Sequence, residues 1–120
     1  MLPLTPDMVA AVYECLRQFP PFSSWKLPPA EEVEFRVNNQ PNTMGEYTRY
    51  ARTVDHIVIV SSLTIGHFAT LASVVAHEMV HLKQALDKTE PTRAGGHNAE
   101  FRRLAKQVCK IHGWDYKAFV

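Results

Sequence analysis

Apolar residues near the N-terminus recur at the spacing of an amphipathic helix. Thr5, Pro6 and Asp7 are residue types that commonly begin a helix. The apolar positions after them are Met8, Val9, Val12, Leu16 and Phe19. The pattern predicts a helix over residues 6–18 that covers one side of a core. Residues 19–29 carry four prolines and predict an extended loop after this helix.

Three segments downstream have the composition of β-strands. Apolar and polar residues alternate over residues 33–38, and residues 45–51 are strand-prone with a weaker alternation. HIVIVSS, at residues 56–62, is rich in β-branched residues. Because the connections are short, the pattern favours an antiparallel meander, in which each strand pairs with the next one in the sequence.

Two further helices are predicted in the second half of the chain. The segment 66–86 is apolar nearly all round in its first half, which predicts a buried helix. A last helix covers residues 98–112, with Gly113 as its C-terminal cap and residues 88–96 as a loop before it. Its inward face is expected to carry Phe101, Leu104, Ala105, Val108 and Ile111. The predicted fold class is α+β, with a small, mainly antiparallel three-stranded sheet between helices.

Composition narrows the class of protein. A chain of 120 residues, 46% apolar and 21% charged, predicts one globular domain over residues 1–120. The net charge of +1 does not support a nucleic-acid or membrane partner, and we expect a monomer. Cys15 and Cys109 are too few for a disulfide framework. The sequence shows no signal peptide and no apolar run of roughly 18 residues, so a cytoplasmic location is expected.

The most apolar segment contains the titratable residues His77, Glu78 and His81, within the sequence HEMVH. Positions i and i+4 of a helix lie on the same face, so both imidazoles can bind one ion. Glu78 is offset by about 100° and can reach a water at an open coordination position. The pattern predicts one catalytic Zn²⁺ bound by the two histidines, with Glu78 as the general base that activates a zinc-bound water.

A catalytic zinc ion usually has three protein ligands. His97 is the favoured third ligand because it continues the inward face of the last helix, and Gly95 and Gly96 permit the turn that aims it. Glu100 is the competing ligand, although a surface position or a hydrogen bond to a ligand imidazole suits it better. The histidines expected to be structural or solvent-facing are His56, His67 and His112.

The motif and its surroundings resemble a known family. HEMVH, followed after a short loop by GGHNAEF and the helix RRLAKQVCKIHG, is similar to the SprT-like zinc metalloproteases. That family has an HExxH helix and then a Gly-His element with an aromatic residue four positions after the histidine. The resemblance covers roughly residues 33 to 113. It implies a zincin-type fold in which His77, His81 and His97 bind zinc and Glu78 is the general base.

The resemblance also implies a function. A zinc-dependent endopeptidase is expected, in which HIVIVSS or a neighbouring strand pairs with an extended peptide of the protein substrate. Many relatives carry a Cys-rich zinc ribbon or DNA-binding extension, and these 120 residues contain neither. The basic residues of the last helix are interpreted as a solvated face. These residues are Arg102, Arg103, Lys106 and Lys110.

Two other functions remain open from the sequence. A non-catalytic, zinc-stabilised module could bind a protein or DNA partner, although such a site has no need of Glu78. A zinc hydrolase acting on a small molecule would have a closed pocket, whereas a cleft beside a free strand edge favours a peptide. The segment WDYKAF is expected to pack against the core, with assistance to an oxyanion by Tyr116 as the alternative.

Overall fold

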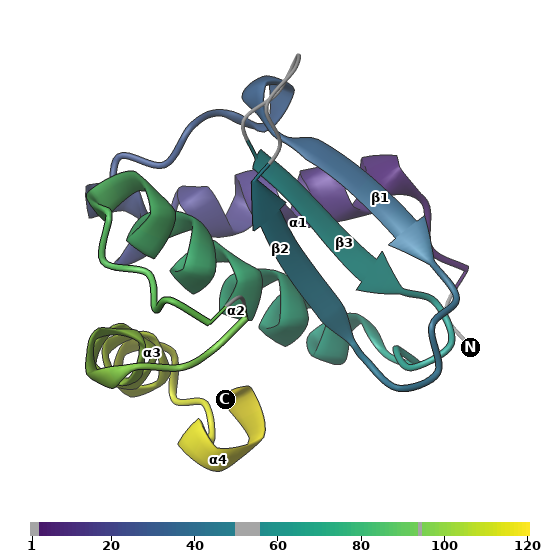
Figure 1. Ribbon diagram of the computed structural model, residues 1–120. Coiled ribbons are helices and arrows are strands. Elements are labelled where there is room, and N and C mark those ends of the chain that lie inside the picture. Colours follow the sequence, from purple (N-terminus) through teal and green to yellow (C-terminus); the bar gives the residue numbers. More distant parts are fainter. Residues whose placement is uncertain (1–2, 50–55, 94) are drawn as a thin grey trace.

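The computed structural model describes residues 3–49, 56–93 and 95–120. Its elements, labelled in Figure 1, are α1 (Pro6–Arg17), the 3-10 turns η1 (Phe22–Ser24) and η2 (Ala30–Glu32), β1 (Glu34–Asn38), β2 (Gly45–Arg49), β3 (His56–Ser61), α2 (Phe68–Asp87), α3 (Ala99–His112) and α4 (Tyr116–Phe119). The predicted helices and strands are present, with ends shifted by at most two residues. Residues 50 and 51 of the second predicted strand lie outside the described residues. The turns η1 and η2 and the short helix α4 were not predicted.

Local chemistry accounts for the ends of the helices. The Thr5 side chain accepts a hydrogen bond from the amide of Met8 at 3.2 Å and caps α1. Asn98 caps α3 in the same way, through the amide of Phe101 at 2.9 Å. Gly113 ends α3 with a φ of 72°, a left-handed conformation that glycine adopts without steric cost. These ends agree with the residue types that predicted them.

The sheet is mixed and has the strand order β1-β3-β2. β3 pairs in parallel with β1 and antiparallel with β2. The predicted antiparallel meander is therefore wrong, because the third strand lies between the first two (Figure 1). HIVIVSS occupies the centre of the sheet with both edges paired, so it cannot be the strand that receives a peptide. The strand with an outer edge beside α2 is β2.

Burial explains why β3 is central. A central strand has a neighbouring strand at each edge and is therefore more buried than an edge strand, which favours apolar residues at consecutive positions. β3 supplies Ile57, Val58, Ile59 and Val60, and Ile59 alone among these four is not fully buried. β1 and β2 carry charged residues within their strands, which suits the edges of a sheet. The apolar content of β3 therefore decides the order, and sequence proximity does not.

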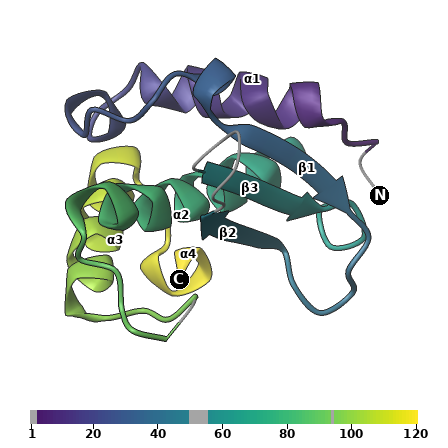
Figure 2. The ribbon, with the colours of Figure 1, turned by 45° about the horizontal axis from the view of Figure 1, so that its top comes forward.

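The helices cover one face of the sheet and extend to one side of it. α1 packs against β1, and α2 packs against β2 and β3. α2 lies between α1 on one side and α3 and α4 on the other (Figures 1 and 2). Half of the 20 residues of α2 are buried as a result, which confirms the prediction of a buried helix. Any polar group on α2 therefore faces neighbours more than solvent.

Gly45 allows β2 to approach α2 closely. It lies opposite Val60 on the face of the sheet that the helices cover. A Cβ atom built on Gly45 would lie 2.7 Å from Val74 Cγ1 and 3.0 Å from Glu78 Oε2. Both separations are shorter than van der Waals contact, so a side chain here would push the strand and the helix apart.

The inward face of α3 differs from the prediction at its last turn. Phe101, Leu104 and Val108 are at most 2% exposed, as expected, whereas Ile111 is 46% exposed. At 3.6 residues per turn the inward stripe passes from position 108 to position 112. His112 occupies that place and donates a hydrogen bond from Nε2 to the Pro20 carbonyl at 2.7 Å. A histidine therefore takes the place expected for isoleucine.

Both cysteines are free, and Cys15 is exposed whereas Cys109 is buried. In the described part of the chain, no helix combines the length and the hydropathy needed to cross a bilayer.

The different exposures of Leu104 and Ile111 predict different losses of stability when each side chain is truncated to alanine. Leu104→Ala should lower the free energy of unfolding by about 2–5 kcal/mol, because it leaves a cavity between α3 and α2. Ile111→Ala should change it by less than about 0.5 kcal/mol. Urea denaturation followed by circular dichroism measures both values. Equal losses would contradict the exposed position of Ile111.

Candidate metal centre

α2 places two imidazoles of the HEMVH motif side by side. His77 and His81 are one helical turn apart, and their ring centroids are 5.1 Å apart. Both rings are partly buried, on the side of α2 that faces α3 and the loop before it. This arrangement follows from the i, i+4 spacing alone.

His97, immediately before α3, joins the pair. Its ring centroid lies 5.0 Å from that of His77 and 5.3 Å from that of His81. One nitrogen from each of the three rings lies within 4.8 Å of the other two. The structure thus brings together the three histidines that the sequence singled out, from two separate segments.

Two contacts and a glycine turn aim His97 at the helix pair. The ring of His97 stacks on the ring of Phe101, with centroids 3.8 Å apart and planes 7° apart. Arg102 Nη1 donates a hydrogen bond to the His97 carbonyl at 2.9 Å. Before it, Gly95 has a φ of 73°, so the turn uses a conformation that glycine readily adopts. The aromatic residue four positions after the histidine is therefore the support on which the ring rests.

A buried amide ties the loop to α2. Gln84 is fully buried, one turn after His81, and its Nε2 donates to the Thr89 carbonyl and to Asn98 Oδ1, each at 2.9 Å. Asn98 Nδ2 also donates to the Thr89 carbonyl at 2.9 Å. The network joins the end of α2, the start of the loop and the residue that caps α3. Its signal in the sequence is a glutamine in an apolar stretch, which spacing rules did not single out.

The C-terminal segment orients His77. The Nδ1 atom of His77 lies 2.7 Å from the carbonyl oxygen of Phe119. A carbonyl can only accept, so Nδ1 carries the proton and Nε2 keeps a lone pair for a ligand. Sequence reasoning missed this role, because a backbone carbonyl supplied by tertiary packing leaves no mark on residue type.

Electrostatics keep the three imidazoles neutral. Burial lowers the pKa of His77 despite the opposing effect of the hydrogen bond to Phe119. Burial, together with the neighbouring His77 and His97, lowers the pKa of His81 to about 3. The pKa of His97 is lowered by burial and by the charge of Arg102. Neutral imidazole is the form that binds a metal.

Glu78 is the buried carboxylate of the site. It is 4% exposed, and its Oε2 faces the position where Gly45 lacks a side chain. Burial, together with the charge of Glu46, raises the pKa of Glu78 to about 8. A nearby cation would favour the charged carboxylate. Glu78 thus combines a dry environment with a place beside the clustered histidines.

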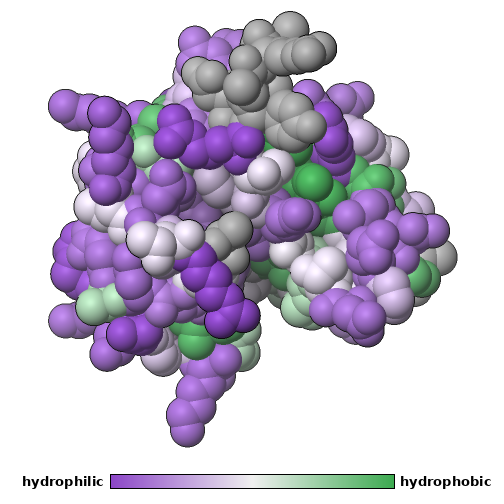
Figure 3. Space-filling view, viewed as in Figure 1, coloured by the Kyte–Doolittle hydropathy of each residue, from purple (hydrophilic) through white to green (hydrophobic). Residues whose placement is uncertain are grey.

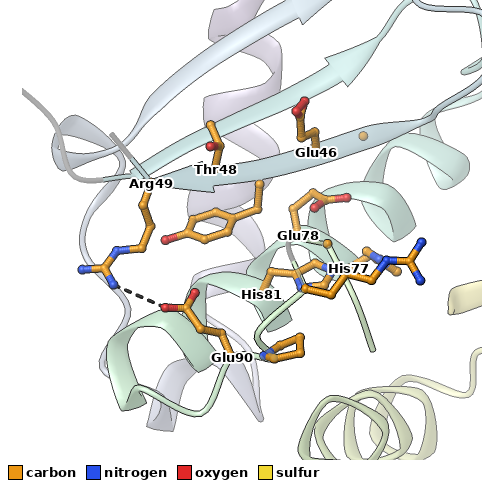
Figure 4. Close-up of a pocket in the computed structure, with 12 residues that line it drawn as sticks. Glu46, Thr48, Arg49, His77, Glu78, His81 and Glu90 are labelled. Carbon is orange, nitrogen blue, oxygen red and sulfur yellow. Dashed lines mark hydrogen bonds and ion pairs between the residues drawn. The ribbon is translucent and has the colours of Figure 1, made fainter. Parts of the chain in front are cut away.

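An open cleft runs along β2 past these residues (Figure 4). One pocket extends from Gly45 to Arg49 and the loop near Glu90, and includes His77, Glu78 and His81. Arg49 and Glu90 point toward one another across it, with Arg49 Nη1 and Glu90 Oε1 3.4 Å apart. A second pocket continues from Gly45 and His77 toward α4. Figure 3 shows the same face, hollowed between the sheet and the C-terminal helices.

The other candidates lie apart from the cluster. Glu100 forms a two-pronged ion pair with Arg103, with both N–O distances 2.7 Å, so the structure places it on the surface of α3. His112 is held by Pro20, His56 Nδ1 lies 2.7 Å from the Tyr47 hydroxyl, and His67 is exposed before α2. Lys106 Nζ lies over the Tyr116 ring, 5.5 Å from the ring centroid. Tyr116 lines neither pocket.

The donor set fits a divalent transition metal. Tetrahedral zinc has bonds of roughly 2.0–2.1 Å to imidazole nitrogen, and a catalytic site leaves its fourth position open. The three neutral imidazoles have nitrogens within 4.8 Å of one another, and His77 and His81 line the cleft, which matches this description. In the described part of the chain no other group of histidine, cysteine or acidic residues is gathered in this way.

The chain belongs to the SprT-like family, whose model matches residues 12–118. The match extends beyond the motif region and takes in parts of α1 and α4. Searches of curated proteins and of solved structures found no match. Family membership is consistent with an enzyme of the metallopeptidase type.

The cluster predicts zinc binding that depends on His97. Metal-stripped protein should bind zinc at one ion per chain and gain about 4 kcal/mol of stability at a zinc concentration 1,000 times Kd. His97→Ala should weaken binding by more than the roughly 10–100-fold typical of losing an outer hydrogen bond. Glu100→Ala is the control and should bind normally. Calorimetric titration measures affinity, and undiminished affinity in His97→Ala would place the third ligand elsewhere.

The contact with Phe119 predicts that the C-terminal segment supports metal affinity. A chain ending at residue 118 loses the carbonyl that orients His77 and should bind zinc about 10–100-fold more weakly. A chain ending at residue 119 keeps Phe119 and an oxygen acceptor at that position, now one oxygen of the terminal carboxylate, and serves as the control. Zinc titration of both truncated chains provides the comparison. Equal affinities would show that the hydrogen bond does not contribute to binding.

Proposed function

We propose that the protein is a zinc-dependent endopeptidase with a zincin-like fold, acting on extended segments of protein substrates. The observation that carries the proposal is the position of Glu78. It is a carboxylate only 4% exposed, on the helix that bears two of the three clustered imidazoles, and it lines a cleft beside β2. Burial of a carboxylate is costly, and a purely structural metal site does not require one.

The residues have distinct parts in the proposed reaction. When bound, zinc polarises a carbonyl and lowers the pKa of water to about 7. His77, His81 and His97 hold the ion, and the Phe119 carbonyl keeps the His77 ring in one orientation. Glu78 accepts a proton from the attacking water and returns it to the leaving amine.

The shape of the site supports a peptide substrate. The cleft is open and follows β2 for the length of the strand. Ser61 N donates to the Met44 carbonyl at 2.9 Å, so these residues form a hydrogen-bonded pair of the antiparallel ladder. By alternation, Gly45 and Arg49 belong to the other type of pair, whose backbone groups point away from β3 toward the cleft. An extended peptide can pair with such an edge.

The two alternatives have less support. A small-molecule hydrolase would be served by a closed pocket, whereas both pockets here open to the surface. A nucleic-acid-binding module would need an available basic surface. The basic residues of α3 are exposed, but Arg103 is paired with Glu100 and Lys106 lies over Tyr116. The net charge of +1 gives no further support for a nucleic-acid partner.

Glu78→Gln tests the proposed function. The amide keeps the shape of the side chain but cannot accept the proton, so peptide hydrolysis should fall by at least about 10²-fold. Zinc should remain bound at one ion per chain. Turnover is measured on an unfolded protein such as denatured casein, with zinc content determined on the same samples.

Glu100→Gln provides the matched control, because it makes the same chemical change on the surface of α3. It should retain wild-type turnover. Unchanged turnover in Glu78→Gln would exclude Glu78 as the general base, and absence of turnover in zinc-loaded wild-type protein would exclude the peptidase function.

A further inference from the structure

The two ends of the cleft differ in chemistry. The pocket at the Arg49 end is lined by charged side chains of both signs, among them Glu46, Glu90 and Arg93. The pocket at the Gly45 end has a volume of about 560 Å³ and, apart from Glu78, its side chains carry no charge. A substrate that spans both pockets therefore meets a polar environment on one side of the metal centre and an apolar one on the other.

The uncharged pocket directly adjoins the proposed reacting groups, since His77 and Glu78 line it as well. Its apolar side chains come from the residue before β2, from α2 and from the C-terminal segment. They are Met44, Ala69, Val74, Ala118, Phe119 and Val120. The side chains of Thr70 and Ser73 lie on the face of α2 that leads to His77, at helical spacing, and also line this pocket.

The direction of β2 decides which part of a substrate reaches this pocket. β2 runs from Gly45, at the uncharged pocket, to Arg49, at the charged one. Antiparallel pairing is the more stable arrangement for a peptide added to its outer edge. An antiparallel peptide enters at Arg49 and leaves at Gly45. The residues before the scissile bond then lie at the charged end, and the residue after it lies at the uncharged end.

We propose that the pocket between α2 and α4 binds an apolar side chain on the C-terminal side of the scissile bond, with Thr70 and Ser73 as specificity-determining residues. The inference rests on the proposed endopeptidase function and names its substrate class: unfolded or extended segments with an apolar residue directly after the cut. An acidic side chain there would find no cationic partner among the lining residues and would approach the Glu78 carboxylate. A basic side chain would have Glu78 as its acidic neighbour, and a metal ion at the histidine cluster would already compensate that charge.

Cleavage mapping tests the assignment. Zinc-loaded wild-type protein is incubated with denatured casein, and the cut bonds are identified by mass spectrometry. Leu, Ile, Phe and Met should follow the cut about tenfold more often than charged residues, relative to their abundance, as expected for a discriminating apolar pocket.

Charge substitutions provide a gain of function. Ser73→Asp and, one turn farther from the metal centre, Thr70→Asp should shift the preference after the cut toward Lys and Arg by up to about fivefold, the effect of a partly exposed ion pair. Ser23→Asp makes the same change at an exposed residue of the turn η1, which lines neither pocket, and should leave the preference unchanged. Zinc content is compared across all variants.

A binding measurement tests the side-chain preference of the pocket without requiring turnover. Zinc-loaded Glu78→Gln is titrated with fluorescent peptides that differ only in having Leu, Asp or Lys after the mapped bond. Leu should bind about tenfold more tightly than either charged residue. Equal binding, no apolar preference in the cleavage map, or an unshifted preference in both aspartate variants would overturn the pocket assignment alone. Absence of any cleavage by zinc-loaded wild type would overturn the endopeptidase function, and the assignment with it.

Discussion

The site depends on bringing three imidazole nitrogens close to one point from two separate segments of chain. α2 supplies His77 and His81 through its own geometry. The third nitrogen comes from His97, which precedes a different helix, so its position depends on how α3 packs against α2. The His97 ring stacks on the Phe101 ring. The buried Gln84 amide joins the end of α2 to Asn98, the residue that caps α3. Loss of either contact would weaken the support that directs the third imidazole toward α2.

Burial gives the site its chemical character. The histidines stay neutral because burial disfavours their charged forms, and Glu78 has a raised pKa for the same reason. A cation among the imidazoles would use their lone pairs and would compensate the charge of Glu78. The apolar character of α2, which makes the motif conspicuous in the sequence, is thus the property that prepares these groups for a metal. The Phe119 carbonyl completes the arrangement from the far end of the chain.

The order of the strands determines what lies beside this site. β3 is apolar on both faces and takes the central place, which leaves β2 at the edge next to α2. Gly45 then allows the strand to approach Val74 and Glu78. A meander in chain order would have placed β2 in the centre and β3 at an edge. The proposed peptide-binding edge and the two chemically distinct pockets both follow from this topology.

Much of the molecule is determined by local sequence. Helix boundaries follow from residues such as Thr5, Asn98 and Gly113, and the histidine pair follows from i, i+4 spacing, because these effects act within a few residues of the chain. Only the tertiary structure decided the strand order and the inward position of His112. It also decided the hydrogen bonds of the Gln84 amide and the hydrogen bond between His77 and the Phe119 carbonyl. They depend on contacts between segments far apart in sequence, where packing selects among arrangements that local propensity leaves equally open.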